Sequence, residues 1–359
     1  MNSFSHLPLA LCLFVSFTSL RAEKIVLVAG GGTAKKDAPA AECRLHEPFG
    51  VEFTPAGEMV IVEMEHGNRV LKVDAKGVLR VIAGTGAKGY SGDGGPAAAA
   101  TFNGIHNLAI TPGGDLLIAD SFNHTLRKID AKTGVIATLA GNGKKGFAGD
   151  GGPAAQAQFS TLIQIALDPA GKHLYCADIG NRRVRRIDLA SGIISTVAGN
   201  GQGGVPTDGA DAVSAPLVDP RAVTPDALGG FYILERNGNA LRYVDPAGKI
   251  RTVAGTGQKG LNGEGGPALA ATMTGPKYLT LDRDGSVLIA DAENHVIRRY
   301  SPKTGLITRV AGTGKKGTAG LGGSPLECEL ARPHGVTVAK DGTLFITDSY
   351  NDRILKIVP

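Results

Sequence analysis

The chain has 359 residues, and 38 Lys and Arg against 33 Asp and Glu give it a net charge of +5. That balance is too mild for a nucleic-acid-binding protein, which needs dense, clustered positive charge. Apolar residues make up 42% of the chain, which is enough for a core, whereas 52 glycines and no tryptophan indicate a chain that turns often.

Residues 1–22 are typical of a secretory signal peptide. An apolar stretch from Leu7 to Leu20 holds no acidic residue, and a small residue ends the segment. A retained anchor is the alternative, because only His6 precedes the apolar run. We predict that cleavage leaves residues 23–359 as a secreted or periplasmic chain with no membrane span, since no later segment is apolar for long enough.

A repeat organises the rest of the chain. An apolar residue followed by Ala and Gly recurs six times at spacings of 54 to 58 residues, at Val28, Ile82, Leu139, Val197, Val253 and Val310. Six copies at this even spacing indicate a repeat architecture.

Each period is expected to hold four short strands. In the second period aliphatic residues fill 108–110, 116–119, 126–129 and 136–139, and Gly, Pro, Asp and Asn occupy the turns between them. No helix of useful length fits between these strands. Four strands per unit and six units predict an all-β fold, a six-bladed β-propeller with four-stranded blades.

The two ends of the mature chain complete each other. The last unit, residues 333–359, stops after its third strand, and residues 23–29 form a strand that has no unit of its own. Pairing this N-terminal strand with the last blade closes the ring. We therefore expect residues 23–359 to be a single domain and a monomer.

Two motifs recur in the chain. An Asp-x-x-Asn-His-x-aliphatic-Arg pattern begins at Asp120 and Asp291, with a variant at Asp348, and Gly-Asp-Gly-Gly-Pro-Ala occurs at 92–97 and 149–154. The first motif resembles the NHL repeat, and the second resembles the long inter-blade loops of exported bacterial NHL-repeat proteins and of the teneurin propeller. The resemblance implies a six-bladed propeller. It leaves the function open, because NHL-like propellers include binding platforms, sensors, RNA-binding modules and some enzymes.

One face of the disc is the expected binding surface. The long loops that lead into the innermost strands, and the loops between second and third strands, lie on this long-loop face, whereas short hairpins lie on the other. Aligning the six innermost strands places equivalent residues beside the central channel, at Phe49, His106, Ile163, Arg221, Lys277 and His334.

Four of these six rim residues can carry positive charge or donate hydrogen bonds. They could hold a small anion, a carboxylate or a sugar acid by converging on it. The alternative is that they only solvate the mouth of a water-filled channel.

A metal site at the same rim is a second hypothesis. The histidines show no metal-ligand spacing. However, Glu47, Asn107 and Asp219 fall near the rim positions and could offer oxygen ligands to a divalent cation such as Ca²⁺, in an arrangement similar to gluconolactonase-like propellers. Ordinary surface carboxylates are the other interpretation, and under it no cofactor is expected.

The repeated Asp and Asn between second and third strands are expected to be structural. Asp can accept hydrogen bonds from the backbone N–H groups that follow it, and Asn can do the same or adopt a left-handed conformation. Blades 1 and 4 depart from the pattern, because Met64 aligns with the Asp in one and Glu235 replaces it in the other. In the inter-blade loops, Asp93 and Asp150 are expected to bind local backbone.

Three cysteines follow the predicted cleavage site, so at most one disulfide can form. Cys43 and Cys328 occupy matching places in the loops that lead into adjacent blades 1 and 6. A disulfide joins them only if both lie close to the channel axis. Cys176 is expected to be a small buried hydrophobe.

The sequence favours a non-enzymatic function. We predict a module that binds a protein, peptide or glycan on the long-loop face, with Phe49 and the four polar rim residues in contact with the ligand, and we expect no nucleic-acid partner. The alternative is a lyase or gluconolactonase-like hydrolase at the channel mouth. In that case His106, His334, Arg221 and Lys277 would serve as acid, base or oxyanion-stabilising groups.

Overall fold

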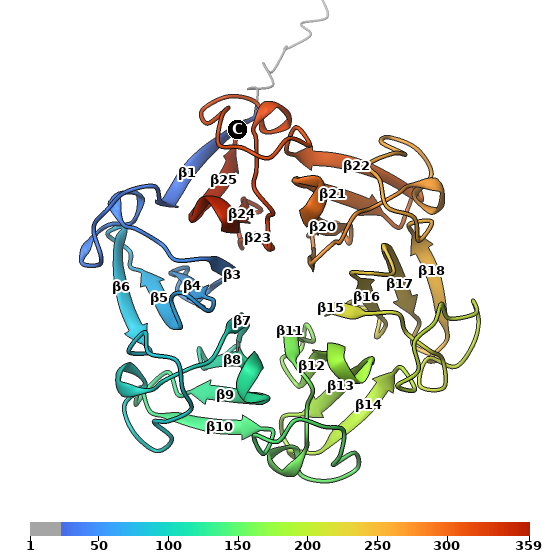
Figure 1. The fold of residues 1–359 in the computed structure, drawn as a ribbon, viewed down its shortest axis with the longest axis horizontal. Coiled ribbons are helices and arrows are strands. Elements are labelled where there is room, and N and C mark those ends of the chain that lie inside the picture. The colour runs from blue at the N-terminus through green and yellow to red at the C-terminus, as the bar shows by residue number, and fades with distance from the viewer. Residues whose placement is uncertain (1–22) are drawn as a thin grey trace, which may run out of the picture.

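The computed structural model describes residues 23–359, so the predicted signal peptide lies outside the described residues. Six antiparallel sheets stand around a central axis (Figure 1), and the chain passes through them in order from β1 to β25. The predicted all-β six-bladed propeller is confirmed.

The first three blades run outward from the axis. Blade 1 consists of β3 (Pro48–Phe53), β4 (Met59–Glu63), β5 (Arg69–Val73) and β6 (Val78–Ala83), with the short β2 (Ala38–Pro39) on its outer edge. Blade 2 consists of β7 (Ile105–Ile110), β8 (Leu116–Asp120), β9 (Thr125–Ile129) and β10 (Ile136–Ala140). Blade 3 consists of β11 (Leu162–Leu167), β12 (His173–Asp178), β13 (Arg183–Asp188) and β14 (Ile194–Ala198).

The last three blades repeat this order. Blade 4 consists of β15 (Pro220–Pro225), β16 (Phe231–Glu235), β17 (Ala240–Val244) and β18 (Ile250–Ala254). Blade 5 consists of β19 (Tyr278–Leu281), β20 (Val287–Asp291), β21 (Val296–Ser301) and β22 (Leu306–Ala311). Blade 6 consists of β23 (Gly335–Val338), β24 (Leu344–Asp348), β25 (Arg353–Val358) and β1 (Lys24–Gly30).

Strand β1 closes the ring as the outermost strand of blade 6. It pairs antiparallel with β25, with Ile25 opposite Ile357 and Leu27 opposite Leu355. The first and last strands of the described chain therefore share a sheet, which confirms the predicted closure.

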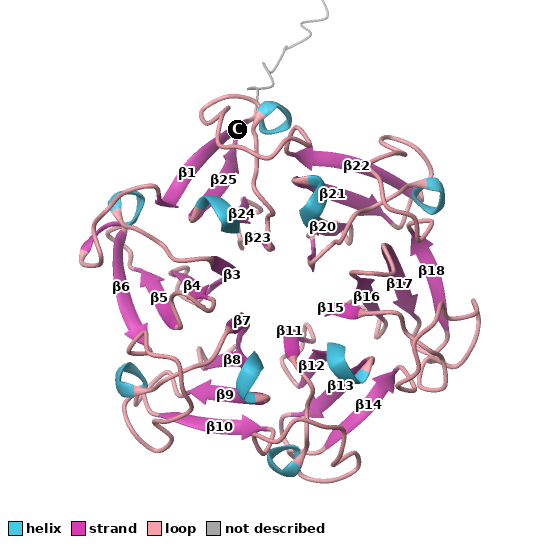
Figure 2. Cartoon of the chain, viewed as in Figure 1, coloured by secondary structure: helices cyan, strands magenta, loops and turns pink. Residues whose placement is uncertain are grey.

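Short 3₁₀ turns are the helical elements of residues 23–359 (Figure 2), and no helix there is long and apolar enough to cross a membrane. Four turns follow second strands near the axis: η3 (Ser121–Asn123), η5 (Ile179–Asn181), η7 (Ala292–Asn294) and η9 (Ser349–Asn351). Five lie at the periphery: η1 (Ala40–Glu42), η2 (Ala97–Ala99), η4 (Ala154–Gln156), η6 (Ala268–Ala270) and η8 (Pro325–Glu327).

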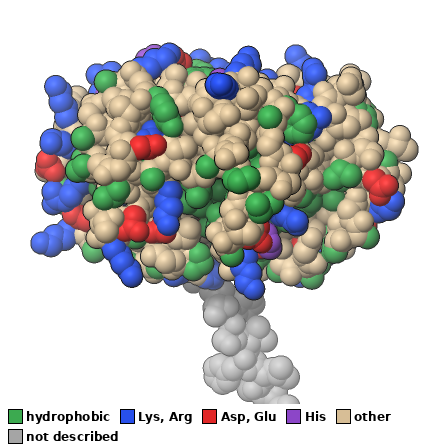
Figure 3. All heavy atoms as spheres, turned by 90° about the horizontal axis from the view of Figure 1, so that it is seen from below, with side chains coloured by type: hydrophobic (Ala, Val, Ile, Leu, Met, Phe, Trp, Pro, Cys, Tyr) green, Lys and Arg blue, Asp and Glu red, His purple; other side chains and the backbone are tan. Residues whose placement is uncertain are grey.

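The hydrophobic core is divided among the six interfaces between neighbouring blades. Aliphatic side chains on both faces of each second strand are buried, because each sheet packs between two others. Most charged side chains lie at the surface, but several Asp, Glu and Arg side chains are buried within the blades. Seen edge-on, the disc carries Lys, Arg, Asp and Glu side chains interspersed, without a continuous basic stripe on the side shown (Figure 3).

Candidate functional site

The six predicted rim residues do come together around the axis on the long-loop face. Each stands at or just before the start of an innermost strand, and each is only 5 to 7% exposed. Five of them, all but Lys277, line one cavity of about 470 Å³, here called the cup. Lys277 borders an adjoining cavity of about 260 Å³, and Arg236 lines both.

Polar side chains bridge the ring beneath the rim. Asn107 in blade 2 donates from Nδ2 to Oη of Tyr278 in blade 5 at 3.2 Å. Gln164 in blade 3 donates from Nε2 to the carbonyl oxygen of Leu279 at 3.0 Å. Because blades 2 and 5 are opposite one another, the first of these bonds crosses the central axis beneath the rim, and the two bonds together are here called the floor.

The wall formed by blades 1, 2 and 6 is aromatic. The ring of Phe49 stacks on that of His334 with centroids 4.1 Å apart, and it meets the edge of His106 at 5.4 Å. Phe122 packs against His106 at 5.5 Å, and Tyr350 stacks on His334 at 5.7 Å. Five rings thus form one continuous surface.

Both rim histidines are neutral. Nδ1 of His106 lies 3.1 Å from the carbonyl oxygen of Gly104, and Nδ1 of His334 lies 2.8 Å from that of Arg332. A carbonyl oxygen only accepts, so each Nδ1 carries a proton, and in the neutral ring Nε2 is left as an acceptor. Burial, and then Arg221, lower the pKa of His106 to about 3, while burial and Lys277 hold that of His334 well below its ordinary value. Of the four rim residues that were expected to be able to carry positive charge, two are therefore neutral, and Arg221 and Lys277 remain.

The opposite wall is cationic, and most of its charges are paired. Nζ of Lys277 lies 2.8 Å from Oε1 of Glu293, which also accepts from Arg332, and Nε of Arg236 donates to Oδ2 of Asp219 at 2.9 Å. Burial outweighs the Glu293 carboxylate and lowers the pKa of Lys277 to about 8.

Arg221 is the exception on this wall. Its guanidinium makes no ion pair and no hydrogen bond within residues 23–359, and its Nε is buried. Arg298, Arg309 and Arg332 also have an unpartnered Nε, but each donates from its other nitrogens. Burial, and then the nearby Arg236, lower the pKa of Arg221. The cup thus contains one buried positive charge without a partner.

The residues proposed for a divalent cation are not brought together as a ligand set. Glu47 accepts from Nδ1 of His66 at 2.6 Å, and Asp219 pairs with Arg236. Oδ1 of Asn107 accepts from the backbone of Ile165 at 3.0 Å, while its amide nitrogen contributes to the floor. Among the described residues, no group of three or more His, Cys, Asp and Glu is arranged to hold a metal ion.

The loop Asp residues have the expected structural role, but with other partners. Oδ1 of Asp120 accepts from the backbone N–H of Asn103, in the preceding loop, at 2.8 Å, and Oδ2 accepts from Nδ2 of Asn123 at 2.8 Å. The residue with left-handed φ is the one after the Asn, here His124 at 57°. The same arrangement recurs at Asp178, Asp291 and Asp348.

Blades 1 and 4 use Glu in the same role. Oε1 of Glu63 accepts from the backbone N–H of His46 at 2.7 Å, and Oε1 of Glu235 accepts from that of Val218 at 2.6 Å. The predicted alignment of Met64 with the Asp is wrong by one residue, because the loop that follows Glu63 is one residue longer than in the other blades. Met64 instead lines the cup.

The Asp residues of the long inter-blade loops bind buried arginines. Asp93 lies 2.6 Å from Nη2 of Arg127, and Asp150 lies 2.6 Å from Nη2 of Arg185. The expectation that they bind local backbone is therefore wrong. These ion pairs fasten each long loop to the third strand of the following blade.

No disulfide joins Cys43 and Cys328. Both are buried free thiols, and they pack in separate hydrophobic clusters, Cys43 between blades 6 and 1 and Cys328 between blades 5 and 6. Although Cys43 and Cys328 occupy matching places in their loops, blade 6 lies between the two clusters that hold them. Cys176 is buried as predicted, and burial raises the pKa of its thiol.

Sequence reasoning missed several residues that line the two cavities. Phe122, Tyr350 and Glu293 each come two residues after the loop Asp, and Arg332 comes two residues before a rim position. The signal was present in the repeat, because the residue type at these positions differs between copies.

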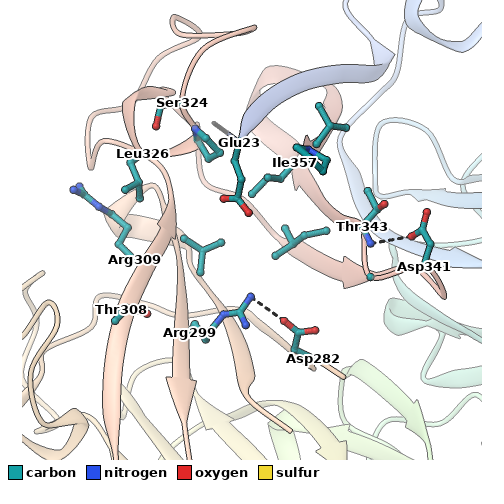
Figure 4. A pocket seen from close by; sticks show the side chains of 16 residues that line it. Glu23, Asp282, Arg299, Thr308, Arg309, Ser324, Leu326, Asp341, Thr343 and Ile357 are labelled. Atoms are coloured by element: carbon teal, nitrogen blue, oxygen red, sulfur yellow. Dashed lines mark hydrogen bonds and ion pairs between the residues drawn. The ribbon is translucent and has the colours of Figure 1, made fainter. Parts of the chain in front are cut away.

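A larger cavity of about 780 Å³ lies between blades 5 and 6, away from the rim (Figure 4). Its charged side chains include an ion pair of 2.8 Å between Arg299 and Asp282, and Asp341 accepts from the backbone of Thr343 at 2.9 Å. The groove's second arginine, Arg309, is half-buried and donates from Nη1 to the carbonyl oxygen of Thr313, so unlike Arg221 it has a hydrogen-bond partner.

Comparison with known proteins identifies an NHL repeat at residues 330–357. The chain is 28% identical over 266 residues to the Arabidopsis thaliana protein SUPPRESSOR OF QUENCHING 1, chloroplastic, covering 71% of this chain and 25% of that protein. It is 24% identical over 334 residues to NHL repeat-containing protein 2 of Bos taurus, covering 84% and 45%. The chain thus spans less than half the length of these two relatives.

Among solved structures, an auxiliary nutrient binding protein from Bacteroides thetaiotaomicron superposes with a TM-score of 0.67 at 17% identity. The match covers 94% of this chain and 76% of that one. At this identity the likeness shows a shared fold alone.

Proposed function

We propose that this chain, a six-bladed NHL-repeat β-propeller, is a binding module that holds part of its protein, peptide or glycan ligand in the cup on the long-loop face. NHL propellers serve as protein-interaction modules, and a rigid ring of repeats presents a concave surface of varied side chains. Residues 1–22 support placing the module in a secreted or periplasmic setting.

The unpartnered guanidinium of Arg221 is the observation that carries this proposal. A buried charge without a partner is costly, and natural proteins keep such groups at sites where a ligand completes them. The cup that surrounds it combines an aromatic wall with a few polar groups, which is a usual character of a ligand site.

The lyase or hydrolase alternative has less support. A general acid or base acts best when its pKa lies near the working pH. The pKa of His106 lies at about 3 and that of His334 is also far below 7, so neither is charged and able to donate a proton at neutral pH. Lys277 has a pKa of about 8, but its ammonium is paired with Glu293 in the adjoining cavity.

The proposed role of the cup in binding can be tested by blocking the cup with a larger side chain. Ile163 lines the cup, so Ile163→Trp occludes it with an apolar side chain. Arg283→Ala, on an exposed hairpin between β19 and β20, is the matched control on the other face. We expect wild type and Arg283→Ala to bind the same members of defined peptide and glycan arrays, and Ile163→Trp to lose them at an unchanged melting temperature. Retention of binding by Ile163→Trp, or no binding by wild type, would contradict the proposal.

A further inference from the structure

We propose that the ligand group held in the cup is a carboxylate attached to a flat apolar moiety, such as an aromatic ring. This inference rests on the proposed function, since it concerns the same cup, and it specifies the chemistry that the cup selects.

The charge of the cup suits a monoanion. Its charged lining residues are Arg221, Arg236 and Asp219, and the last two pair with each other at 2.9 Å. One positive charge is left over, on Arg221. The cations of the adjoining cavity, Lys277 and Arg332, already share Glu293. A phosphate ester would bring two negative charges to a single free cation, whereas a carboxylate brings one.

The shape of the free group also favours a carboxylate. A guanidinium presents a planar fork of N–H donors that matches the two oxygens of a carboxylate in a bidentate pair. Arg221 is 6% exposed, so a carboxylate that reaches it leaves water and meets a charge that is itself poorly hydrated. Such a pair is worth more than the same pair at the surface.

The rest of the cup is apolar and uncharged. Phe49, Phe122 and Tyr350 form the aromatic wall with the two histidine rings. These rings are neutral because burial lowers the pKa of both, and each donates from Nδ1–H to a backbone carbonyl. An aromatic group stacks or meets ring edges favourably on such a wall. Since the cup has a volume of about 470 Å³, the apolar part that it holds must be compact.

Two sources can supply this chemistry. One is a free aromatic acid, and the other is the C-terminus of a peptide whose last residue is aromatic, with its chain leaving through the open side of the cup. Both place a carboxylate beside Arg221 and a ring on the aromatic wall.

The first experiment measures binding of small probes by calorimetry. We expect phenylacetate to bind, and phenylacetamide and acetate to bind about 10- to 100-fold more weakly, because each lacks one of the two recognised parts. Arg221→Gln should bind phenylacetate more weakly by a similar factor. Arg221→Lys should keep part of the affinity for phenylacetate, and Arg283→Ala should keep all of it. Equal binding of the amide or of acetate, or tighter binding of phenyl phosphate, overturns the inference.

The second experiment compares Gly-Gly-Phe with a free C-terminus and as its C-terminal amide. If the free acid of Gly-Gly-Phe binds at least as tightly as phenylacetate and the amide binds more weakly, the inference is supported and a peptide C-terminus is identified as the source. Binding of phenylacetate alone supports it with a free acid as the source. If no probe binds while Ile163→Trp still abolishes array binding, the carboxylate inference fails and the proposed function stands.

Discussion

Arg221 differs from the other deeply buried arginines of residues 23–359 in making no ion pair. Arg127 and Arg185 are fully buried, but each lies between two carboxylates, at 2.6 and 3.5 Å for Arg127 and at 2.6 and 3.7 Å for Arg185. A buried ion that lacks such partners loses its hydration without gaining a compensating Coulombic attraction. The folded state is therefore less stable than the same fold with an apolar residue at position 221.

This contrast predicts opposite effects of two similar substitutions. Arg221→Met should raise the free energy of unfolding by about 1–3 kcal/mol, because it removes an unpaired buried charge. Arg127→Met should lower it by about 3–5 kcal/mol, because Asp120 and Asp93 lose their partner. Urea unfolding measures both. A loss of stability in Arg221→Met comparable to that in Arg127→Met would show that the guanidinium has a partner in solution.

The loops between second and third strands fasten each blade to the next. In five of the six loops the residue with left-handed φ accepts a hydrogen bond from the backbone N–H of the following blade's long loop at 2.8 to 3.3 Å. Five blades share this contact, made by Asn68, His124, Asn239, His295 and Asp352. At the two histidines Nδ1 is the acceptor, so these contacts require the neutral ring.

The histidine contacts predict a dependence of stability on pH. Burial lowers the pKa of His124 and His295 below the ordinary 6.5, so the unfolded chain takes up their protons first. Their contribution to stability is complete above pH 6.5 and declines as the pH falls through the folded-state pKa. In His124→Asn/His295→Asn the acceptor is kept, as in blades 1 and 4, and the titration is removed. Between pH 7 and 5 the melting temperature of this variant should fall by less than that of wild type.

His66→Asn is the control for this effect, with the opposite sign. The hydrogen bond to Glu47 raises the pKa of His66, so its contribution is complete below pH 6.5 and is lost as the pH rises. Replacing His66 should therefore make the melting temperature fall more steeply as the pH is lowered. A double variant as acid-sensitive as wild type would show that the two histidines do not govern the inter-blade contacts.

At the scale of the whole molecule, stability depends on closing the ring. Each blade buries its apolar faces only against its two neighbours, so blade 6 requires β1 to complete its sheet and to cover the cluster it shares with blade 5. Ile25 on β1 is fully buried in that cluster, whereas the adjacent Lys24 is exposed. The closing strand therefore contributes packing as well as backbone hydrogen bonds.

Two substitutions on this strand test the closure. Ile25→Asp buries a charge in the cluster and should destabilise the ring by about 4 kcal/mol or more, while Lys24→Asp should change stability by less than about 0.5 kcal/mol. Thermal melting and limited proteolysis of β1 report the effect. Equal stability of the two variants would mean that the ring holds without its closing strand.

The repeat is the reason that so much could be predicted from one sequence. Equivalent positions in six copies must occupy equivalent places around an axis, so the spacing of the Ala-Gly signal determined the blade number, the closing strand and the six rim residues. Local turn chemistry also identified the loop Asp and Asn residues as structural. These inferences depend only on periodicity and on short-range geometry.

Features that depend on contacts between different copies were decided by the tertiary structure. The floor joins Asn107 of blade 2 to Tyr278 of blade 5, and the neutral state of His106 and His334 depends on burial and on carbonyls that face them. Arg221 has the same periodic position as five other residues, and nothing in the sequence distinguishes it from a solvated cation. The repeat fixes where each rim side chain stands, whereas its charge state and partners follow from distances across the ring.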